Sequence, residues 1–130
     1  MKYFTQQELM NSNTAKRLGI WNWTDDAQVW ANLYALVDNV LDPAREKLGQ
    51  PIYVNSGYRS KETNIAVGGA KNSQHMKGEA CDVRIDGSQQ KLFNVLKTME
   101  FDQLIWYRKK GFCHVSYVTY RPNRRQVIYA

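Results

Sequence analysis

The sequence is poor in the residues that build disulfide frameworks and membrane spans. Its 130 residues include two cysteines, two histidines and three prolines. No run approaches the roughly 18–20 consecutive apolar residues that cross a bilayer, so we expect no membrane insertion. Cys81 and Cys113 are too few for a disulfide framework and lack a C-x-x-C spacing, so we expect two buried, reduced thiols.

The first residues also lack the features of a secretory signal. Met1–Glu8 contain one lysine but no apolar stretch and no small-residue cleavage site, so we expect synthesis in the cytoplasm. A length of 130 residues with 43% apolar content suits a single domain over residues 1–130. The net charge of +6 favours polyanionic surroundings such as nucleic acid, anionic lipid or an acidic cell wall. Much of this charge gathers near the C-terminus, where a solvated face is expected.

The predicted elements place helices first and strands later. A cap at residues 24–26 begins a long helix that Gly49 ends, and Pro43 is expected to kink this helix or to restart it with Asp42 as a new cap. Shorter helices are expected at residues 6–10, 15–18 and 89–99 and after Ser60, and strands at residues 51–54, 80–85, 102–107, 112–118 and 126–129. This order is typical of an α+β fold, in which helices pack on one face of a mostly antiparallel sheet.

Side-chain alternation along two of the strands sorts the polar residues onto one face. Asp82 lies between the inward-facing Cys81 and Val83, and His114 lies between Cys113 and Val115. If the two strands are neighbours, Asp82 and His114 project into a shared cleft on the face away from the helices.

His75, on the loop before the first of these strands, can complete a cluster of three with Asp82 and His114. Two imidazoles and a carboxylate are typical zinc ligands, and they leave a fourth tetrahedral position open. Taken alone, His75 is equally compatible with a solvated loop residue that binds no metal, and His114 with an ordinary strand histidine. The agreement of three ligand-type residues, in a chain with only two histidines, favours a metal site.

The segment His75-x-x-Gly78-x-Ala80-x-Asp82 follows Ser73 and is introduced by Ser56-Gly57-Tyr58-Arg59-Ser60. Together with the later strand histidine, this pattern resembles the zinc D-alanyl-D-alanine carboxypeptidase and phage endolysin peptidase family, of hedgehog/D,D-peptidase-like fold. The resemblance covers nearly the whole chain and is close to the short branch of the family.

The resemblance implies that His75, Asp82 and His114 bind one Zn²⁺ ion. It also implies that Arg59 directs its guanidinium at the substrate carbonyl that becomes an oxyanion. Ser73, two residues before the first ligand, either binds substrate or hydrogen-bonds the loop backbone.

The general base departs from the family pattern. Many members carry it as a glutamate three residues before the last zinc histidine, where this chain has Gly111. A peptidase still needs a proton shuttle between the attacking water and the leaving amine. Asp102, at the start of the strand expected to form a hairpin with that of His114, is the candidate base. Glu79 is the alternative, although its parity aligns it with Cys81 on the core side, or else it lies in the turn facing solvent.

Three functions are compatible with these features. The leading hypothesis is a zinc metallopeptidase that hydrolyses an amide in the stem peptide of peptidoglycan, as a carboxypeptidase or an endopeptidase, and that reaches the wall after release from the cell as phage enzymes do. The alternative is a catalytically silent, zinc-containing module that binds the cell wall, because Gly111 replaces the expected base. A basic nucleic-acid-binding domain is disfavoured, because the open face of the sheet carries ligand-type residues in place of stacking aromatics. We expect a monomer and no nucleic-acid partner.

Overall fold

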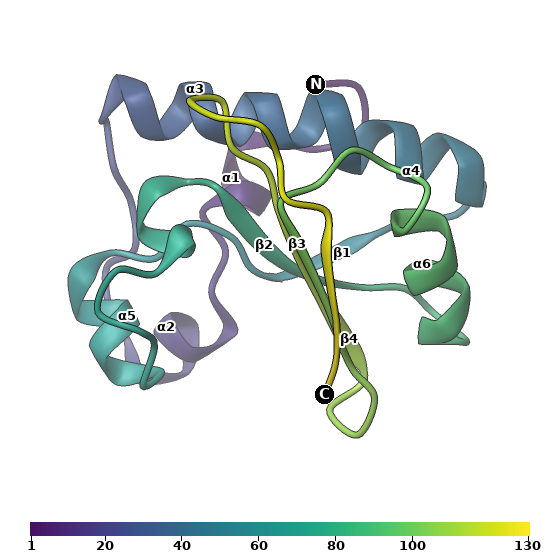
Figure 1. Ribbon diagram of the computed structural model, residues 1–130. Helices are drawn as coiled ribbons and strands as arrows, with labels where there is room; N and C mark the ends of the chain where they lie inside the picture. Colours follow the sequence, from purple (N-terminus) through teal and green to yellow (C-terminus); the bar gives the residue numbers. More distant parts are fainter.

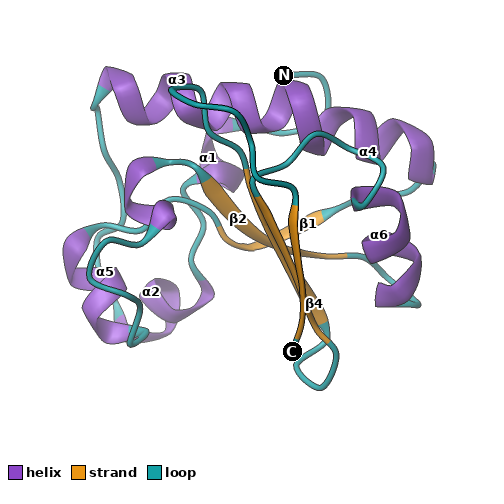
Figure 2. Ribbon diagram, viewed as in Figure 1, coloured by secondary structure: helices purple, strands orange, loops and turns teal.

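The computed structural model describes residues 1–130 and contains one five-stranded sheet. The strands are β1 (Tyr53–Ser56), β2 (Ala80–Arg84), β3 (Gln103–Tyr107), β4 (Phe112–Ser116) and β5 (Gln126–Tyr129). They lie in the order β1-β2-β4-β3-β5, and every neighbouring pair is antiparallel except β3 and β5. The expected α+β class with a mostly antiparallel sheet is confirmed (Figures 1 and 2).

A long helical rod runs along one side of the sheet, at the top of Figure 1. It consists of α3 (Ala27–Leu36), a π-helical turn (Val37–Leu41) and α4 (Asp42–Leu48), with Gly49 as its left-handed C-cap. Asp26 caps its first turn by accepting from the backbone N–H groups of Gln28 and Val29. None of the helices combines the length and the apolar character needed to cross a membrane.

The expected restart at Pro43, with Asp42 as a new cap, does not occur, although a π-helical turn interrupts the α-helix just before the proline. The rod continues through the π-helical turn, which precedes the proline and accommodates its missing N–H group. Asp42 does not cap a new helix. Its carboxylate accepts from the backbone N–H groups of Lys2, at 2.6 Å, and Tyr3, at 3.2 Å, and so ties the N-terminal segment to the rod.

Four shorter α-helices and one 3₁₀ helix complete the fold. They are α1 (Gln6–Leu9), α2 (Asn13–Leu18), α5 (Lys61–Ala66), α6 (Gln89–Leu96) and the 3₁₀ helix η2 (Gln74–Lys77). The capping box of Thr5 and Glu8 is present as predicted, and Ser60 caps α5. The segment that carries His75, expected as a loop, forms η2.

Strand alternation separates the two faces of the sheet as predicted. Cys81, Val83, Cys113 and Val115 are buried in the core that the rod and α6 cover, whereas Asp82 and His114 lie on the opposite face. The two cysteines are unpaired. Burial raises the pKa of the Cys113 thiol to about 12 and that of Cys81 higher still, so both act as small apolar side chains.

The rod also positions the segment that carries His75. Asn32 of α3 donates from its side chain to the carbonyl oxygen of Lys77, at 2.9 Å. Gly78 ends η2 in the left-handed conformation, with φ of +75°, and packs against α3. A Cβ atom at this position would lie 2.5 Å from the carbonyl oxygen of Val29 and 3.1 Å from Leu33 Cγ. Only glycine satisfies both the backbone conformation and the space.

Gly78→Ala is expected to lower the free energy of unfolding by more than Gly49→Ala. Gly49 has φ of +69° and nothing within 4 Å of an added Cβ atom, so its substitution costs only the left-handed strain, about 1–2 kcal/mol. At Gly78 the overlap with α3 adds about 1–3 kcal/mol. Urea unfolding of the two variants measures the difference. Equal losses would show that contact with α3 does not constrain this turn.

Candidate metal centre

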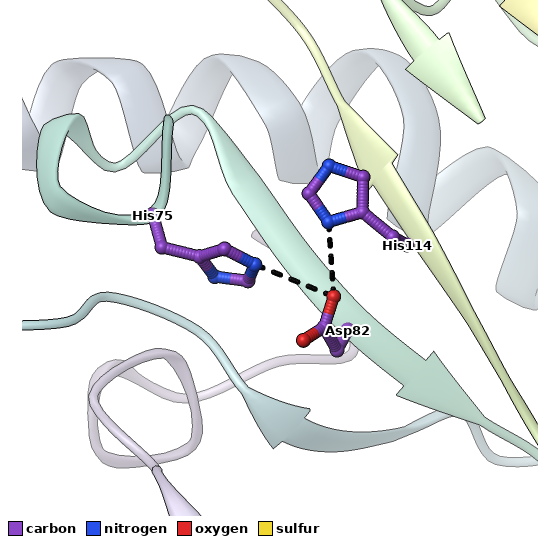
Figure 3. A group of neighbouring side chains, drawn as sticks. All are labelled: His75, Asp82 and His114. Carbon is purple, nitrogen blue, oxygen red and sulfur yellow. Dashed lines mark hydrogen bonds and ion pairs between the residues drawn. The ribbon is translucent and has the colours of Figure 1, made fainter. Parts of the chain in front are cut away.

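His75, Asp82 and His114 converge on one point although they come from distant parts of the chain. Asp82 on β2 pairs directly with His114 on β4, so both side chains project from the same face at the same height. His75 reaches them from η2. Asp82 Oδ1 lies 3.0 Å from His114 Nδ1 and 3.3 Å from His75 Nε2, and the three possible ligand atoms lie within 4.8 Å of one another. Figure 3 shows both rings directed at the same carboxylate oxygen.

The spacing of these atoms fits a zinc ion. Bonds of about 2.0–2.1 Å in a tetrahedral arrangement place neighbouring ligand atoms about 3.3 Å apart. The two short distances in the cluster, 3.0 and 3.3 Å, are close to this edge length. Two imidazole nitrogens and one carboxylate oxygen are also the donor types that Zn²⁺ accepts in sites with an open fourth position.

The His75 ring is held in the orientation and protonation state that metal binding needs. Its Nδ1 lies 2.8 Å from the carbonyl oxygen of Gly57, so Nδ1–H donates and the Nε2 lone pair faces Asp82. Burial lowers the pKa of His75, while the neighbouring Asp82 opposes this effect. The ring is therefore neutral near pH 7, which is the form that binds metal.

Asp82 is an ionised carboxylate whose two oxygens have separate partners. Oδ1 faces the two histidines, and Oδ2 accepts from Nη2 of Arg59 at 3.2 Å. Burial raises the pKa of Asp82, but the contact with the His114 ring outweighs it and holds the pKa well below its usual range. Arg59 is fixed on its other side by Ser56, whose Oγ lies 3.1 Å from Nε.

The cluster lies in a cleft of about 500 Å³. Ser73 lines this cleft and also caps η2, because its Oγ accepts from the backbone N–H of His75 at 3.2 Å. The loop-backbone bond considered for Ser73 is therefore present, and the hydroxyl still borders the space where a substrate would lie. The other polar or ionisable side chains of the cleft, apart from the cluster itself, are those of Arg59, Asn72, Gln74, Gln103, Tyr107 and Lys110.

Comparison with known proteins agrees with this geometry. A sequence model described as Peptidase M15 matches residues 2–116. The chain belongs to the peptidase M15 family. A curated relative, the zinc D-Ala-D-Ala carboxypeptidase of Streptomyces albus G, is 39% identical over 82 residues, which are 62% of this chain and 30% of the relative. The family resemblance drawn from the H-x-x-G-x-A-x-D segment is thus confirmed, although the chain spans only about a third of that relative's length.

The structure does not bring Asp102, the expected general base, into the lining of the cleft of this M15 protein. Its side chain is fully buried elsewhere, where Oδ1 accepts from Arg121 at 2.6 Å and Oδ2 from Arg124 at 2.8 Å. Gln74 donates to Oδ2 at 3.2 Å. Burial raises the pKa of this carboxyl, but these hydrogen bonds hold the pKa well below its usual range, which makes Asp102 a poor proton acceptor.

The Asp102 cluster has a structural role instead. Arg121 and Arg124 belong to the basic C-terminal stretch that was expected to be solvated, and Gln74 belongs to η2 beside His75. One carboxylate thereby joins the C-terminal segment to the helix that carries a candidate ligand. Asp102 thus supports the position of His75 through Gln74.

Glu79, the alternative base, directly precedes β2 and does not line the metal cleft. It is 3% exposed, borders a separate cavity next to α3, and is absent from the lining of the metal cleft. Its Oε1 has no hydrogen-bond partner within the chain, and burial raises its pKa. The core-side placement that strand parity predicted for Glu79 is confirmed.

Tyr107 is a cleft residue that the sequence analysis did not identify. It lies on β3 two residues after Ile105, which pairs with His114, so its side chain is on the metal face. Its ring stacks on Phe112 with centroids 4.8 Å apart. Burial and the charge of Asp82 raise the pKa of the phenol, so it is protonated near neutral pH. The sequence contained the signal for this position. Leu104 faces inward, so strand alternation places Gln103, Ile105 and Tyr107 on the opposite, metal-binding face.

Asp102→Asn is expected to reduce stability by about 2–3 kcal/mol at pH 7. The expected loss is below the 3–5 kcal/mol of fully buried pairs because the two arginines are 34% and 50% exposed. The pKa of Asp102 is lower in the folded than in the unfolded protein. Its ionised carboxylate therefore stabilises the fold at pH values above the unfolded-state pKa, which is about 4, and this contribution is lost as the pH falls through the folded-state pKa. The variant should therefore lose less stability than the parent between about pH 5 and pH 2.

Denaturant unfolding across that pH range measures the effect. Asp38→Asn, at a carboxylate that is 58% exposed, serves as the control and should change stability by less than about 0.5 kcal/mol. A variant Asp102→Asn of unchanged stability but greatly reduced hydrolysis would return Asp102 to the role of base.

Proposed function

We propose that this M15 protein is a zinc metallopeptidase that hydrolyses an amide bond in the peptide part of peptidoglycan. The observation that carries the proposal is the cluster of His75, Asp82 and His114, in which both imidazoles lie at about the edge length of a zinc tetrahedron from the same carboxylate oxygen. The name of the Streptomyces relative supports a D-Ala-D-Ala carboxypeptidase activity. An endolysin-type endopeptidase that acts after release from the cell is the second form of the same proposal.

Each of the main cleft residues would have a separate role in hydrolysis. His75, Asp82 and His114 would hold one Zn²⁺ ion per chain, which would supply Lewis acidity to the substrate carbonyl and to the attacking water. Arg59, held in place by Asp82 and Ser56, offers a fixed cation to the developing negative charge of the substrate carbonyl. Ser73 keeps η2 and its histidine in position and borders the substrate.

Tyr107 is our candidate for the proton donor. Apart from the ligand Asp82, no carboxylate lines the cleft, and the remaining ionisable side chains are Arg59, Tyr107 and Lys110. A phenol with a raised pKa keeps its proton near neutral pH, so it can donate a hydrogen bond to the substrate or to the leaving amine. The attacking water would give its proton to solvent, and Tyr107 would recover from solvent the proton that it gives to the amine. This cycle would not use the glutamate that Gly111 replaces.

A catalytically silent wall-binding module is the second candidate. The lack of a free carboxylate in the cleft favours it. Such a module would retain zinc and bind wall fragments but would release no product.

The deciding experiment incubates zinc-loaded protein with purified peptidoglycan and analyses the released material by mass spectrometry. Release of free alanine identifies a carboxypeptidase, and shortened cross-links identify an endopeptidase. His75→Ala is expected to abolish both hydrolysis and bound zinc, because it removes a ligand.

Metal content is measured in parallel on the same preparations. Lys71→Ala, an exposed change in the same loop and outside the cleft lining, is the matched control and should keep both properties. If the parent protein binds zinc but releases no product, the result supports the silent wall-binding module. If His75→Ala hydrolyses peptidoglycan as fast as the parent, the metallopeptidase proposal is wrong.

Tyr107→Phe is expected to lower kcat by about 10²-fold or more and to leave zinc content unchanged. The substitution removes only the phenolic oxygen and keeps the ring that stacks on Phe112. Steady-state rates on a stem peptide, together with metal analysis, measure the effect. A kcat equal to that of the parent would show that Tyr107 contributes packing alone.

A further inference from the structure

A second cavity lies away from the metal cleft and shares none of its lining residues. It has a volume of about 950 Å³ and is formed by α1, the start of α2, residues 20–23 and β1 (elements labelled in Figure 1). We call it the Trp21 groove. The residues that carry the argument are Gln7, Asn13, Trp21, Trp23, Tyr53 and Asn55.

Aromatic side chains line this groove. Trp21 is 78% exposed, the highest value among the large hydrophobic side chains of the protein, and Tyr53 is 37% exposed. Trp23 is fixed beside them, because its Nε1 donates to Asp25 at 3.1 Å. An indole left this exposed next to a concavity gains free energy when an apolar surface covers it.

The polar part of the groove consists mainly of uncharged amides. The side chains of Gln7 and Asn55 make no hydrogen bond within the chain, so their donors and acceptors are available to a ligand. Asn55 lies at the register shift between Val54 and Ser56, where β1 departs from regular pairing with β2. Asn13 uses only its Oδ1, which accepts from Asn11.

The chemistry of these groups selects a saccharide. The apolar face of a pyranose ring stacks on an aromatic side chain, and amides exchange hydrogen bonds with hydroxyl and acetamido groups. An anionic ligand would need convergent free cations. Arg84, one of the two cations of the groove, already lies over the Tyr53 ring at 4.7 Å and 3.8 Å from Asp86.

We propose that the Trp21 groove binds a glycan strand of N-acetylated amino sugars. The choice of this glycan rests on the proposed function, because the stem peptides of peptidoglycan branch from such strands. Arg84 of the groove and Asp82 of the metal cleft lie two residues apart on the same face of β2, a separation of about 7 Å. A glycan in the groove can therefore present a peptide branch to the cleft.

Asn22 links the groove to the segment that leads to the metal cleft. Its amide donates to the carbonyl oxygens of Met10 and Tyr58, both at 2.8 Å, and its Oδ1 accepts from the backbone N–H of Ser60. This residue thus joins a segment that lines the groove to the segment that carries Arg59. The two sites are held in a fixed relation by hydrogen bonds rather than by a flexible linker.

The direct test uses a peptide-free probe, a soluble tetramer of N-acetylglucosamine. Binding is followed by the NMR signal of the Trp21 indole N–H and by calorimetry. Trp21→Ala is expected to weaken binding at least tenfold, and Gln7→Ala is a second, independent groove variant. Tyr120→Ala removes another aromatic side chain, 66% exposed and outside the groove, and should bind as the parent does.

The same titration on His75→Ala separates this inference from the proposed function. Saccharide binding by that variant supports the groove even if no peptide is cleaved. If the parent does not bind the tetramer at millimolar concentration, or if Trp21→Ala and Gln7→Ala bind as tightly as the parent, the inference is overturned. In an active enzyme, Trp21→Ala should also lower the ratio of hydrolysis of intact peptidoglycan to hydrolysis of free stem peptide about tenfold. An unchanged ratio would contradict the proposal.

Discussion

The direct pairing of Asp82 with His114 across β2 and β4 is the constraint on which the site depends. In an antiparallel sheet, opposed residues on one face have neighbouring Cβ atoms, so the carboxylate and the imidazole meet without help from a flexible loop. Their partners then complete the arrangement. Gly57 orients His75, and Arg59 occupies the second oxygen of Asp82. A shift of either strand by one residue would turn the ligand that this strand carries toward the core and separate it from its partner.

Buried polar contacts hold the remaining candidate ligand against this sheet. Asn32 and Gly78 attach η2 to the long helical rod, and Gln74 attaches it to Asp102. Asp102 is in turn held by two arginines of the C-terminal segment. The helix that bears His75 is therefore braced from two directions, which reduces the reorganisation needed when a metal binds. The same contacts explain why a fully buried aspartate outside the cleft is tolerated.

Strand parity predicted that Asp82 and His114 share the open face of the sheet. The same rule was not applied to β3, and Asp102 was therefore expected near the metal site. Alternation around Cys81 and Cys113 placed Asp82 and His114 on the open face, and the structure brings them together there. Applied to β3, the same rule puts Asp102 with Leu104 on the inner side and Tyr107 on the metal face. The prediction that Asp42 caps a new helix at Pro43 was wrong for another reason. A π-helical turn accommodates the missing N–H group, and Asp42 pairs with the N-terminal backbone, which is distant in sequence.

The sequence by itself determined the fold class, because hydrophobic periodicity and strand alternation are local properties. The resemblance of the H-x-x-G-x-A-x-D segment indicated the family and the three residues most suited to hold zinc. Tertiary structure alone decided which other groups share the cleft. The partners of Asp102 lie 19 and 22 residues further along the chain, and Gly57 is 18 residues from the ring that it orients. Contacts of that range depend on how the elements pack, since the spacing of residues along the chain does not specify which segments meet.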